Sequence, residues 1–457
     1  MSKNYSPWIH QISRTRPIVA LHSDIEADVA IVGGGIAGIS TAFFALRDTD
    51  KSIVLLEAGK IAHGATGHNA GQVASYFERP FHELVEEFGA VLATEGQRDI
   101  ELAWELIDQI YTEAGLDIYF SRFIGYDGFS TFDQVMDHLK KNILRAAGGL
   151  KPEMLYISED ADFGKNISEK YAGFYTLVPH KEVLDRLETG KSGFIAVSEQ
   201  PRGVLNSALF TEEVAQYLLK KYAGRFSIFE NSKVHKVVLK DDHALLDVGT
   251  CSATVRRVVL CTNGFENLEI FNAAGLGIDT RFHHDINGVV GRMSGYIETM
   301  NKSPIAISYY LTPQPGFDDM EDPYFYLTRR AYEYNHGRHN LICLGGPQHA
   351  IPDREEYVFE YEYKDEVSKE TDSFVKSLYD IDPNKKIEYI FSWHGLMGYT
   401  PNGVRRVGPE PLNPVLMYNL GCNGVGILPS IYGGKRISRI LNGEKLSPSI
   451  FDPHDQR

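Results

Sequence analysis

Residues 27–38 read ADVAIVGGGIAG, an apolar, β-branched stretch that runs directly into the pattern Gly-x-Gly-x-x-Gly. The stretch predicts a strand, and the glycines predict a tight turn at Gly33 followed at once by a helix. Gly35 lacks a Cβ and lets the backbone approach a pyrophosphate, while Gly38 lets the helix pack closely on the strand. The helix N-terminus directs N–H groups and a partial positive charge towards the phosphates.

The residues after the glycines have the order that a dinucleotide site requires. Residues 36–46 predict a short buried helix, and residues 52–57 predict the next parallel strand, which ends in Glu57 at the usual offset from the glycines. Glu57 is expected to accept hydrogen bonds from a ribose diol, and an acid in this place disfavours the 2′-phosphate of NADP. NAD and FAD both fit these residues, and a glycine-rich turn without a ligand is the alternative.

Composition narrows the class of protein. A chain of 457 residues predicts two or three domains, and its 43% hydrophobic and 23% charged residues are ordinary for a globular enzyme. The formal charge of −15 argues against nucleic acid as a partner, because phosphate binding needs Lys and Arg. A negative field is compatible with a cationic substrate such as a polyamine. The expected partner is a small molecule.

The sequence lacks the usual signals for secretion and for membrane insertion. No N-terminal segment has the order of a signal peptide and no apolar run is long enough to span a bilayer, so a cytoplasmic protein is expected. The four cysteines form no CxxC pair, which predicts free thiols, no disulfide framework and no metal site. These cysteines are Cys251, Cys261, Cys343 and Cys422.

Apolar periodicity predicts the order of elements. Residues up to about Asp24 predict an arm that packs over the first domain. Predicted helices cover residues 81–88, 100–107, 132–147, 212–222 and 372–379. Predicted strands cover residues 226–230, 233–238, 244–248, 253–262, 295–298, 324–329 and 341–346. The strand at 253–262 stops in a small-residue turn, and ligands of open α/β sheets bind at such strand ends.

Three separated segments match one family. Residues 58–73 read AGKIAHGATGHNAGQV, residues 258–264 form the strand and turn just described, and the third segment contains Trp393-His394-Gly395, Tyr399-Thr400-Pro401-Asn402, Gly408 and the run GCNGVG at 421–426. Together they resemble the D-amino-acid oxidase (DAO) family of FAD-dependent oxidoreductases, particularly its γ-glutamylputrescine oxidase-like branch. The resemblance covers nearly the whole chain and is weak at 151–174.

The resemblance implies an α/β fold, α+β overall, with two domains. Residues 1–80, 195–273 and 390–457 would form a discontinuous, Rossmann-like FAD-binding domain. Residues 81–194 and 274–389 would form a substrate domain with a mainly antiparallel sheet and helices. A second glycine cluster stands at 421–426, before a predicted helix at 429–441. An ADP site has no need of it. At the pyrimidine edge of a flavin, however, its N–H groups and the helix dipole would stabilise the negative charge that develops on reduction.

The motifs and the resemblance therefore predict FAD as the cofactor, with the backbone of Val234 at the adenine. The predicted cofactor-binding residues are Gly33, Gly35, Ile36, Ala37, Gly38, Glu57, Ala58, Gly64, Ala65, Thr66, His68, Asn69, Ala70, Gly71, Gln72, Val234, Thr262, Asn263, Gly264, Gly395, Gly424, Val425, Gly426 and Ile427. His68 matches a loop in which some relatives join a histidine covalently to the flavin. Noncovalent FAD is expected, with a covalent link at His68 as the alternative.

Departures from the relatives bear on the substrate. Met397 stands where monomeric sarcosine oxidases attach FAD through a cysteine, and Ile427-Leu428 stand where they place a lysine for the substrate carboxylate. Arg329 is a candidate carboxylate ligand, with Arg292 and Arg330 as other candidates and a structural role as the alternative for each. His394, Tyr326 and Tyr399 are candidate polar groups of the catalytic cavity, or otherwise core residues.

The resemblance implies an FAD-dependent oxidoreductase that oxidises the C–N bond of a primary or secondary amine, such as an amino acid, a polyamine or a derivative. Hydride would pass from the α-carbon to flavin N5, water would hydrolyse the imine, and oxygen would reoxidise the flavin and form hydrogen peroxide. One alternative is a flavin dehydrogenase that passes electrons to another acceptor. A second is a flavin-binding protein without catalytic activity.

Overall fold

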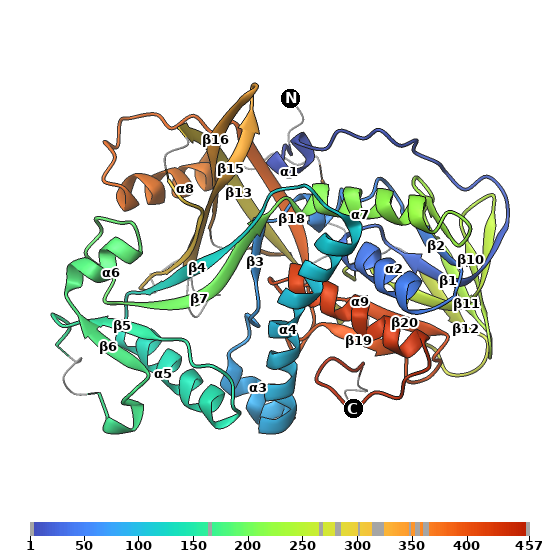
Figure 1. Ribbon diagram of the computed structural model, residues 1–457, viewed down its shortest axis with the longest axis horizontal. Helices are drawn as coiled ribbons and strands as arrows, with labels where there is room; N and C mark the ends of the chain where they lie inside the picture. Colours follow the sequence, from blue (N-terminus) through green and yellow to red (C-terminus); the bar gives the residue numbers. More distant parts are fainter. Residues whose placement is uncertain are drawn as a thin grey trace.

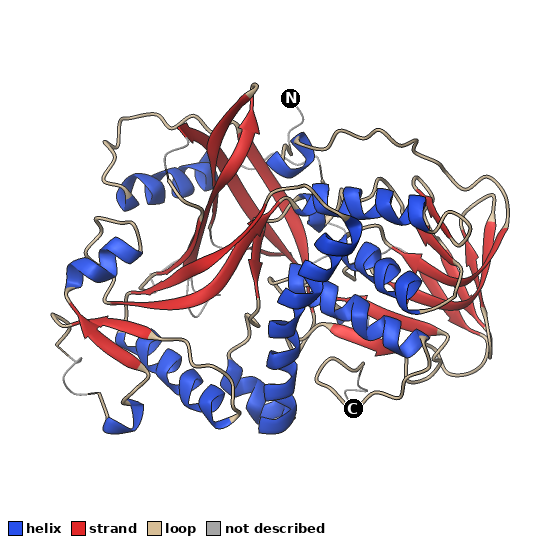
Figure 2. Cartoon of the chain, viewed as in Figure 1, coloured by secondary structure: helices blue, strands red, loops and turns tan. Residues whose placement is uncertain are grey.

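The computed structural model describes residues 4–162, 167–264, 268–278, 285–299, 302–312, 324–346, 349–351, 357–359 and 365–453. In this part of the chain two sheets lie side by side, each with helices packed against it (Figures 1 and 2). No helix in these ranges is long and apolar enough to cross a membrane. The expected α/β fold with a second, mainly antiparallel sheet is confirmed.

The first sheet, on the right in Figure 1, contains the opening motif. Its strand order is β12-β9-β10-β11-β1-β2-β8, with β20 also paired to β11 and β19 paired to β20. β1, β2, β8, β11 and β20 run parallel. The strands are β1 (Ile25–Val32), β2 (Ile53–Leu56), β8 (Phe226–Phe229), β9 (Lys236–Leu239), β10 (Ala244–Asp247), β11 (Ser252–Leu260), β12 (Glu269–Asn272), β19 (Arg406–Pro409) and β20 (Leu416–Leu420).

The apolar run in β1 is continuous because both faces of the strand are covered. Val29 and Ile31 face a core that contains α2 (Ile36–Asp48) and α9 (Ile427–Leu441), whereas Ala30 and Val32 face the core on the opposite side of the sheet. Parallel strands buried on both faces have this composition. The same core receives side chains from α3 (Phe81–Phe88), α4 (Ala90–Ala114) and α7 (Ser207–Lys221).

The second sheet has the strand order β17-β13-β16-β15-β14-β4-β7-β5-β6, with β18 paired to β13 and β3 paired to β7. Most of these pairs are antiparallel, and the pairs β14–β4 and β5–β6 are parallel. The strands are β3 (Gln72–Ala74), β4 (Phe120–Phe129), β5 (Leu155–Ser158), β6 (Tyr175–Val178), β7 (Ala196–Leu205), β13 (Asn287–Thr299), β14 (Ile305–Tyr310), β15 (Tyr324–Tyr334), β16 (Gly337–Gly345), β17 (His349–Ile351) and β18 (Phe391–Tyr399).

Helices cover the outer parts of the second sheet. α8 (Asp365–Leu378) packs Phe374, Val375 and Leu378 into a core with β14, β15 and β16. The remaining helical segments are α1 (Pro7–His10), α5 (Phe132–Ala147), α6 (His180–Arg186) and the short 3₁₀ turns Ala65–Gly67 and Glu169–Tyr171. The predicted helices at 81–88 and 132–147 are confirmed with these bounds, and those predicted at 100–107, 212–222 and 372–379 lie mostly or entirely within α4, α7 and α8.

Two details differ from the sequence predictions. The strand predicted from Lys233 begins at Lys236, which leaves Val234 in the loop before β9. The segments assigned to the cofactor domain contain β3, β7 and β18, yet these strands belong to the second sheet. The division of the chain into two discontinuous domains stays a prediction.

The first residues of the chain contact both halves of the molecule. Arg16 forms ion pairs with Glu212 on α7 and Glu230 after β8, at 2.7 Å in each case. Trp8 in α1 packs edge-on against Trp393 on β18. The predicted arm over the first domain therefore also reaches the second sheet.

The turn after β1 leaves no room for a side chain at Gly38 in the first turn of α2. A Cβ built on Gly38 would lie 1.9 Å from the carbonyl oxygen of Gly33. We expect Gly38→Ala to force α2 away from β1 and to destabilise the protein by about 2 kcal/mol or more, as measured by urea unfolding.

Gly224→Ala is the matched control, because a Cβ there meets no atom within 4 Å. Equal unfolding free energies for the two variants would show that the contact between Gly38 and Gly33 is not a constraint.

Candidate functional site

A cavity of about 610 Å³ lies at the carboxyl ends of β1, β2 and β11 and is closed on its other side by β13, β15 and β18 of the second sheet. Its size is in the range of cofactor and substrate sites. The carboxyl edge of a parallel sheet is also where ligands of α/β folds bind. The two sheets thus enclose the cavity between them.

The first end of the cavity is formed by the turn between β1 and α2. Gly33 has φ +106°, and a Cβ there would lie 2.7 Å from the carbonyl oxygen of Cys261 on the neighbouring strand. The N–H of Ile36, the first residue of α2, donates to Oγ1 of Thr66 at 2.9 Å. The N-terminus of α2 therefore faces the cavity, where it favours an anionic group.

Glu57 lines the cavity next to this turn. Its Oε2 accepts from the N–H of Gly34 at 2.7 Å and its Oε1 accepts from the N–H of Gly59 at 2.8 Å. Burial raises the pKa of Glu57, and the two N–H groups act against that shift. A carboxylate has about four acceptor positions, so two remain for the hydroxyl groups of a ligand.

The loop after β2 is held in place by Asn69. Its side-chain amide donates to the carbonyl oxygen of Thr66 at 3.0 Å and to Oγ of Ser207 at 2.9 Å. The backbone carbonyl oxygen of Asn69 accepts hydrogen bonds from the indole N–H groups of Trp8 at 2.5 Å and Trp393 at 3.1 Å. The loop is thereby fixed to both sheets along the side of the cavity.

His68 in this loop is neutral at physiological pH. Its Nδ1 lies 3.0 Å from the carbonyl oxygen of Gly64, so Nδ1 carries the proton and donates it, and Nε2 is left unprotonated. Burial lowers the pKa of His68 to about 4. Gly395 on β18 packs against this residue so closely that a Cβ would lie 2.5 Å from the His68 carbonyl oxygen.

The second glycine cluster lines the cavity at the N-terminus of α9. Gly424 has φ +74°, and the residues that follow it, up to Ile427, all contribute to the wall. Asn263 after β11 accepts a hydrogen bond from the N–H of Cys422 at 2.9 Å and fixes the cluster to the first sheet. The cavity therefore has two helix N-termini in its wall, those of α2 and α9.

Arg405 is buried beside this cluster and also lines the cavity. Its guanidinium donates to Oδ1 of Asn419 at 2.6 Å and to the carbonyl oxygens of Asn419 at 2.8 Å and Gly421 at 3.2 Å. Burial lowers the pKa of Arg405 to about 10. A buried cation whose described acceptors are all neutral indicates a cavity suited to an anionic ligand.

The side of the cavity formed by the second sheet is aromatic. Tyr76, Tyr324 and Tyr326 line it together with Met293 and Ser308. Glu78 also lines it and accepts hydrogen bonds from the hydroxyls of Tyr399 at 2.5 Å and Tyr324 at 3.2 Å. Burial raises the pKa of Glu78, and the two hydroxyl donors oppose this shift.

A family model described as DAO, FAD dependent oxidoreductase, matches residues 28–440. This chain belongs to the DAO family. A putative Rieske 2Fe-2S iron-sulfur protein, YhfW of Bacillus subtilis, is 39% identical over 70 residues, which are 15% of this chain and 14% of YhfW. γ-Glutamylputrescine oxidoreductase of Escherichia coli is 36% identical over 73 residues, which are 16% of this chain and 17% of that protein. Only short segments of these curated relatives are therefore matched.

Solved structures share the fold of this DAO-family chain. Glycine oxidase from Geobacillus kaustophilus has a TM-score of 0.66 and 16% identity, and the similarity covers 95% of this chain and all of that one. L-Proline dehydrogenase from P. horikoshii has the same TM-score and identity and covers 94% and 97% of the two chains. L-Amino acid deaminase from Proteus vulgaris has a TM-score of 0.61 and 17% identity over 98% of each chain.

The cavity fits FAD, the cofactor of the DAO family. Glu57 offers acceptors for ribose, the N-terminus of α2 and the buried Arg405 suit phosphates or another anionic group, and the glycine cluster before α9 leaves space for a flat ring. These features come from opposite ends of the sequence. The fold places them around one continuous space.

Most of the predicted cofactor residues line this cavity. They are Gly33, Gly35, Ile36, Ala37, Glu57, Ala58, Gly64, Ala65, Thr66, His68, Asn69, Ala70, Gln72, Val234, Thr262, Asn263, Gly395, Gly424, Val425, Gly426 and Ile427. Three predicted residues are not part of the wall. Gly38 packs on Gly33, Gly71 packs on Trp8, and Gly264 packs on Ile286.

The candidate catalytic residues are distributed differently. Tyr326 lines the cavity, and Tyr399 contacts it through its hydrogen bond to Glu78. His394 is buried behind the wall, where its Nδ1 lies 3.0 Å from the hydroxyl of Tyr357, a cavity residue.

Arg329 does not lie in the cavity, contrary to its prediction as a carboxylate ligand. It forms two hydrogen bonds with the carboxylate of Glu188, at 2.6 and 2.7 Å. Side chains alternate between the faces of a strand, and Tyr324 and Tyr326 occupy the cavity face of β15, so Arg329 points to the other face.

The other two candidate arginines also lie outside the wall of the cavity. Arg292 on β13 alternates with Gly291 and Met293, which line the cavity. Arg330 lies against the rings of Trp8 and Tyr119.

Several cavity residues lie outside the predicted set. Glu78, Tyr76 and Tyr324 lie outside every motif, and Arg405 stands three residues after the quoted Asn402. A buried-strand pattern with polar residues on one face was the available signal for Tyr324, which shares its face with Tyr326. No local signal marks Glu78.

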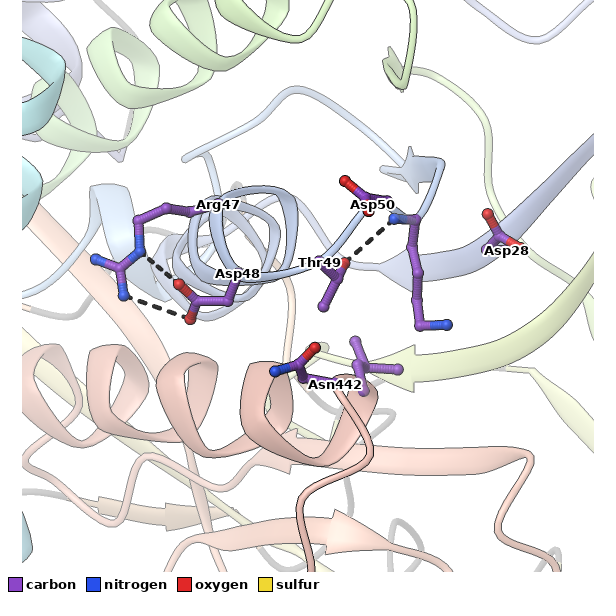
Figure 3. A pocket seen from close by; sticks show the side chains of 8 residues that line it. Asp28, Arg47, Asp48, Thr49, Asp50 and Asn442 are labelled. Atoms are coloured by element: carbon purple, nitrogen blue, oxygen red, sulfur yellow. Dashed lines mark hydrogen bonds and ion pairs between the residues drawn. The ribbon is translucent and has the colours of Figure 1, made fainter.

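A separate surface hollow lies at the opposite edge of the first sheet. It is lined by residues at the ends of α2 and α9 and by Asp28, and ion pairs such as Arg47–Asp48 occupy it (Figure 3). Asp28, Asp48 and Asp50 line it together with the cations Arg47 and Lys51, and the edge is the amino end of β2, not the carboxyl end. We assign it no role.

The role of Glu57 can be tested through FAD affinity. Glu57→Gln places an amide NH₂ group against one of the two backbone N–H donors and weakens the acceptors left for ribose. We expect the dissociation constant of FAD to rise roughly 10- to 100-fold, as measured by flavin fluorescence on reconstitution of the apoprotein.

Glu26→Gln, at an exposed position in the first half of β1, is the control and should leave the constant unchanged. A normal FAD affinity in Glu57→Gln would rule out Glu57 as a ligand of the cofactor.

Proposed function

We propose that this DAO-family chain oxidises the C–N bond of a primary or secondary amine with FAD as its cofactor. The observation that carries the proposal is the cavity, which joins the glycine motif and Glu57 to an aromatic chamber where, among the described residues, Glu78 supplies the carboxyl group. A chamber of this kind suits a small organic substrate held beside a flat cofactor.

The relatives support this class of reaction. By their names, γ-glutamylputrescine oxidoreductase, glycine oxidase, L-proline dehydrogenase and L-amino acid deaminase act on amines or amino acids. The first is similar over a short segment, and the solved structures are similar in fold. Their shared chemistry makes an amine the expected substrate here.

The residues of this chain would contribute position, charge and exclusion of water. Bound FAD would supply a two-electron acceptor. The aromatic wall with Tyr324 and Tyr326 would hold the α-carbon of the amine against the cofactor and keep water away. N–H groups of residues 424–426 and the N-terminus of α9 would stabilise negative charge on the reduced cofactor. The oxidised product is an imine, which water hydrolyses to a carbonyl compound and an amine or ammonia.

Oxygen is the proposed final electron acceptor, with hydrogen peroxide as the second product. A dehydrogenase that uses another acceptor is the second candidate, because glycine oxidase and L-proline dehydrogenase resemble this fold equally well, each with a TM-score of 0.66. The two candidates differ in one measurable property, the rate at which the reduced enzyme reacts with air.

We expect anaerobic addition of a suitable amine to bleach the flavin absorbance of the purified protein, and expect air to restore it with one hydrogen peroxide per cycle. A panel of amines, polyamines and amino acids is the appropriate set of probes. Slow reoxidation by air together with rapid reduction of an artificial acceptor would favour the dehydrogenase. No bleaching by any compound would contradict the proposed reaction and favour a protein that binds flavin without catalysis.

We further propose that FAD is held without a covalent bond. The neutral ring of His68 donates Nδ1–H to Gly64 and is packed edge-on against Phe359, which gives it a structural role in the cavity wall. Acid precipitation of the holoprotein should leave all yellow colour in the supernatant. Colour retained in the pellet, and lost in His68→Ala, would instead establish a covalent link at His68.

A further inference from the structure

Glu78 is fixed beside the second glycine cluster. The hydroxyls of Tyr399 and Tyr324 donate to its two carboxyl oxygens, at 2.5 and 3.2 Å. Its carboxyl carbon lies so close to Gly424 that a Cβ built there would be 2.0 Å away. The two hydroxyls use two of the roughly four acceptor positions of a carboxylate, so the group can still accept hydrogen bonds from a ligand in the cavity.

The charges of the cavity are divided between its two sides. Among the residues that the structure describes, its charged lining side chains are Glu57, Lys233, Arg405 and Glu78. Lys233 neighbours Val234 at the nucleotide end, and Arg405 is bound to Asn419 and Gly421 of the first sheet. Of these four charged side chains, Glu78 is thus the one on the aromatic side of the cavity.

The surroundings of Glu78 suit a cation. The rings of Tyr76, Tyr324 and Tyr326 line the same side of the cavity, and aromatic faces attract ammonium groups. A substrate carboxylate would instead need an arginine or a lysine. Arg329 cannot serve there, because it is bound to Glu188 on the other face of β15.

We propose that Glu78 binds the amino group of the substrate and accepts its proton, and that it selects amines without a carboxylate on the carbon next to nitrogen. The proposal rests on the amine oxidation proposed above and adds the group that recognises the amine. One N–H bond of the ammonium ion breaks, one O–H bond forms on the Glu78 carboxylate, and the electron pair stays on nitrogen. The neutral amine that results is the form from which the α-carbon can lose hydride.

Burial favours this transfer. It raises the pKa of Glu78, so the carboxyl group holds a proton more strongly than in water. A carboxylate and an ammonium ion that share one proton in such a site can lower the cost of burying two charges by becoming a neutral acid and a neutral amine. A carboxylate elsewhere on the reacting carbon would lie next to Glu78 and would be repelled while Glu78 is ionised.

The other groups near Glu78 do not change charge in the neutral range. Burial raises the pKa of five surrounding tyrosines, that of Tyr76 to about 12, and keeps them protonated; they are Tyr76, Tyr310, Tyr324, Tyr326 and Tyr399. Burial also raises the pKa of the Cys422 thiol. Arg202 lies over the ring of Tyr76 and is paired with Asp127 at 2.9 Å.

Glu78 also contacts a second hollow, of about 580 Å³, that opens to the surface beside α3 and the end of β18. Arg79 in its wall is paired with Glu83 and Glu87 on α3. The carboxyl group therefore lies between the inner cavity and the surface, which gives the proton that it accepts a route to solvent.

The test compares Glu78→Gln with the wild type and with Glu83→Gln, a control that removes a carboxylate from the outer hollow alone. Each holoprotein is first checked for FAD content. Flavin reduction is then followed anaerobically with amines and with the amino acids that yield them on decarboxylation, such as isobutylamine and valine, whose single amino group lies next to the carboxylate in the amino acid. In the wild type we expect the amine of each pair to reduce the flavin faster than its amino acid, with a rate that rises with pH through the raised pKa of Glu78 and then levels off.

In Glu78→Gln the amine must enter already neutral, so the rise should move to the pKa of the amine itself, near 10, and the rate at neutral pH should fall roughly 100-fold or more. Glu83→Gln should behave as the wild type. An unchanged pH profile in Glu78→Gln would overturn the role of Glu78 in proton transfer, and a wild type that prefers the amino acids would overturn its role in selection. In both cases the proposed amine oxidation would stand. A wild type reduced by neither kind of compound would refute the proposed function itself.

Discussion

The contact between the Gly33 carbonyl oxygen and α2 determines the geometry of the cofactor half. Because Gly38 has no side chain, α2 begins directly over the end of β1, and its N-terminus faces the cavity. α9 also packs closely on α2, since a Cβ on Gly434 would lie 2.7 Å from the backbone of Ser40. The position of the second glycine cluster, at the start of α9, therefore follows from the position of α2. Two regions almost 400 residues apart in the chain are brought together by backbone-to-backbone packing.

The second sheet contributes the other wall, and Asn69 is one of the points at which it contacts the first half. The carbonyl oxygen of this residue receives two indole N–H groups, from Trp8 and Trp393, while its side chain holds Thr66 and Ser207. Bonds of this kind fix a loop without adding charge to the cavity. Among the described residues, charge in the cavity wall is confined to a few positions, Glu57, Lys233 and Arg405 towards the first sheet and Glu78 towards the second.

Local sequence predicted the nucleotide end of this site far better than the substrate end. Gly33, Gly35 and Glu57 belong to one continuous strand–helix–strand unit, whose spacing is set by the ligand and the backbone together. Glu78, Tyr324 and Tyr399 meet only because β3, β15 and β18 converge, and no spacing in the sequence encodes that meeting. Arg329, predicted as a carboxylate ligand, lies outside the cavity because of the face of β15 that it occupies. The face on which Arg329 lies follows from the alternation of side chains only once Tyr326 is known to face the cavity.

The first residues of the chain support the site without lining it. Trp8 supplies one of the two indole donors to the backbone carbonyl of Asn69, and Arg16 pairs the same segment with Glu212 and Glu230. Removal of these residues would take away the indole N–H of Trp8 and leave that of Trp393 as the indole donor to the loop at 64–72. An affinity tag joined to the amino terminus, or a shortened version of the protein, would therefore act on flavin retention from a distance.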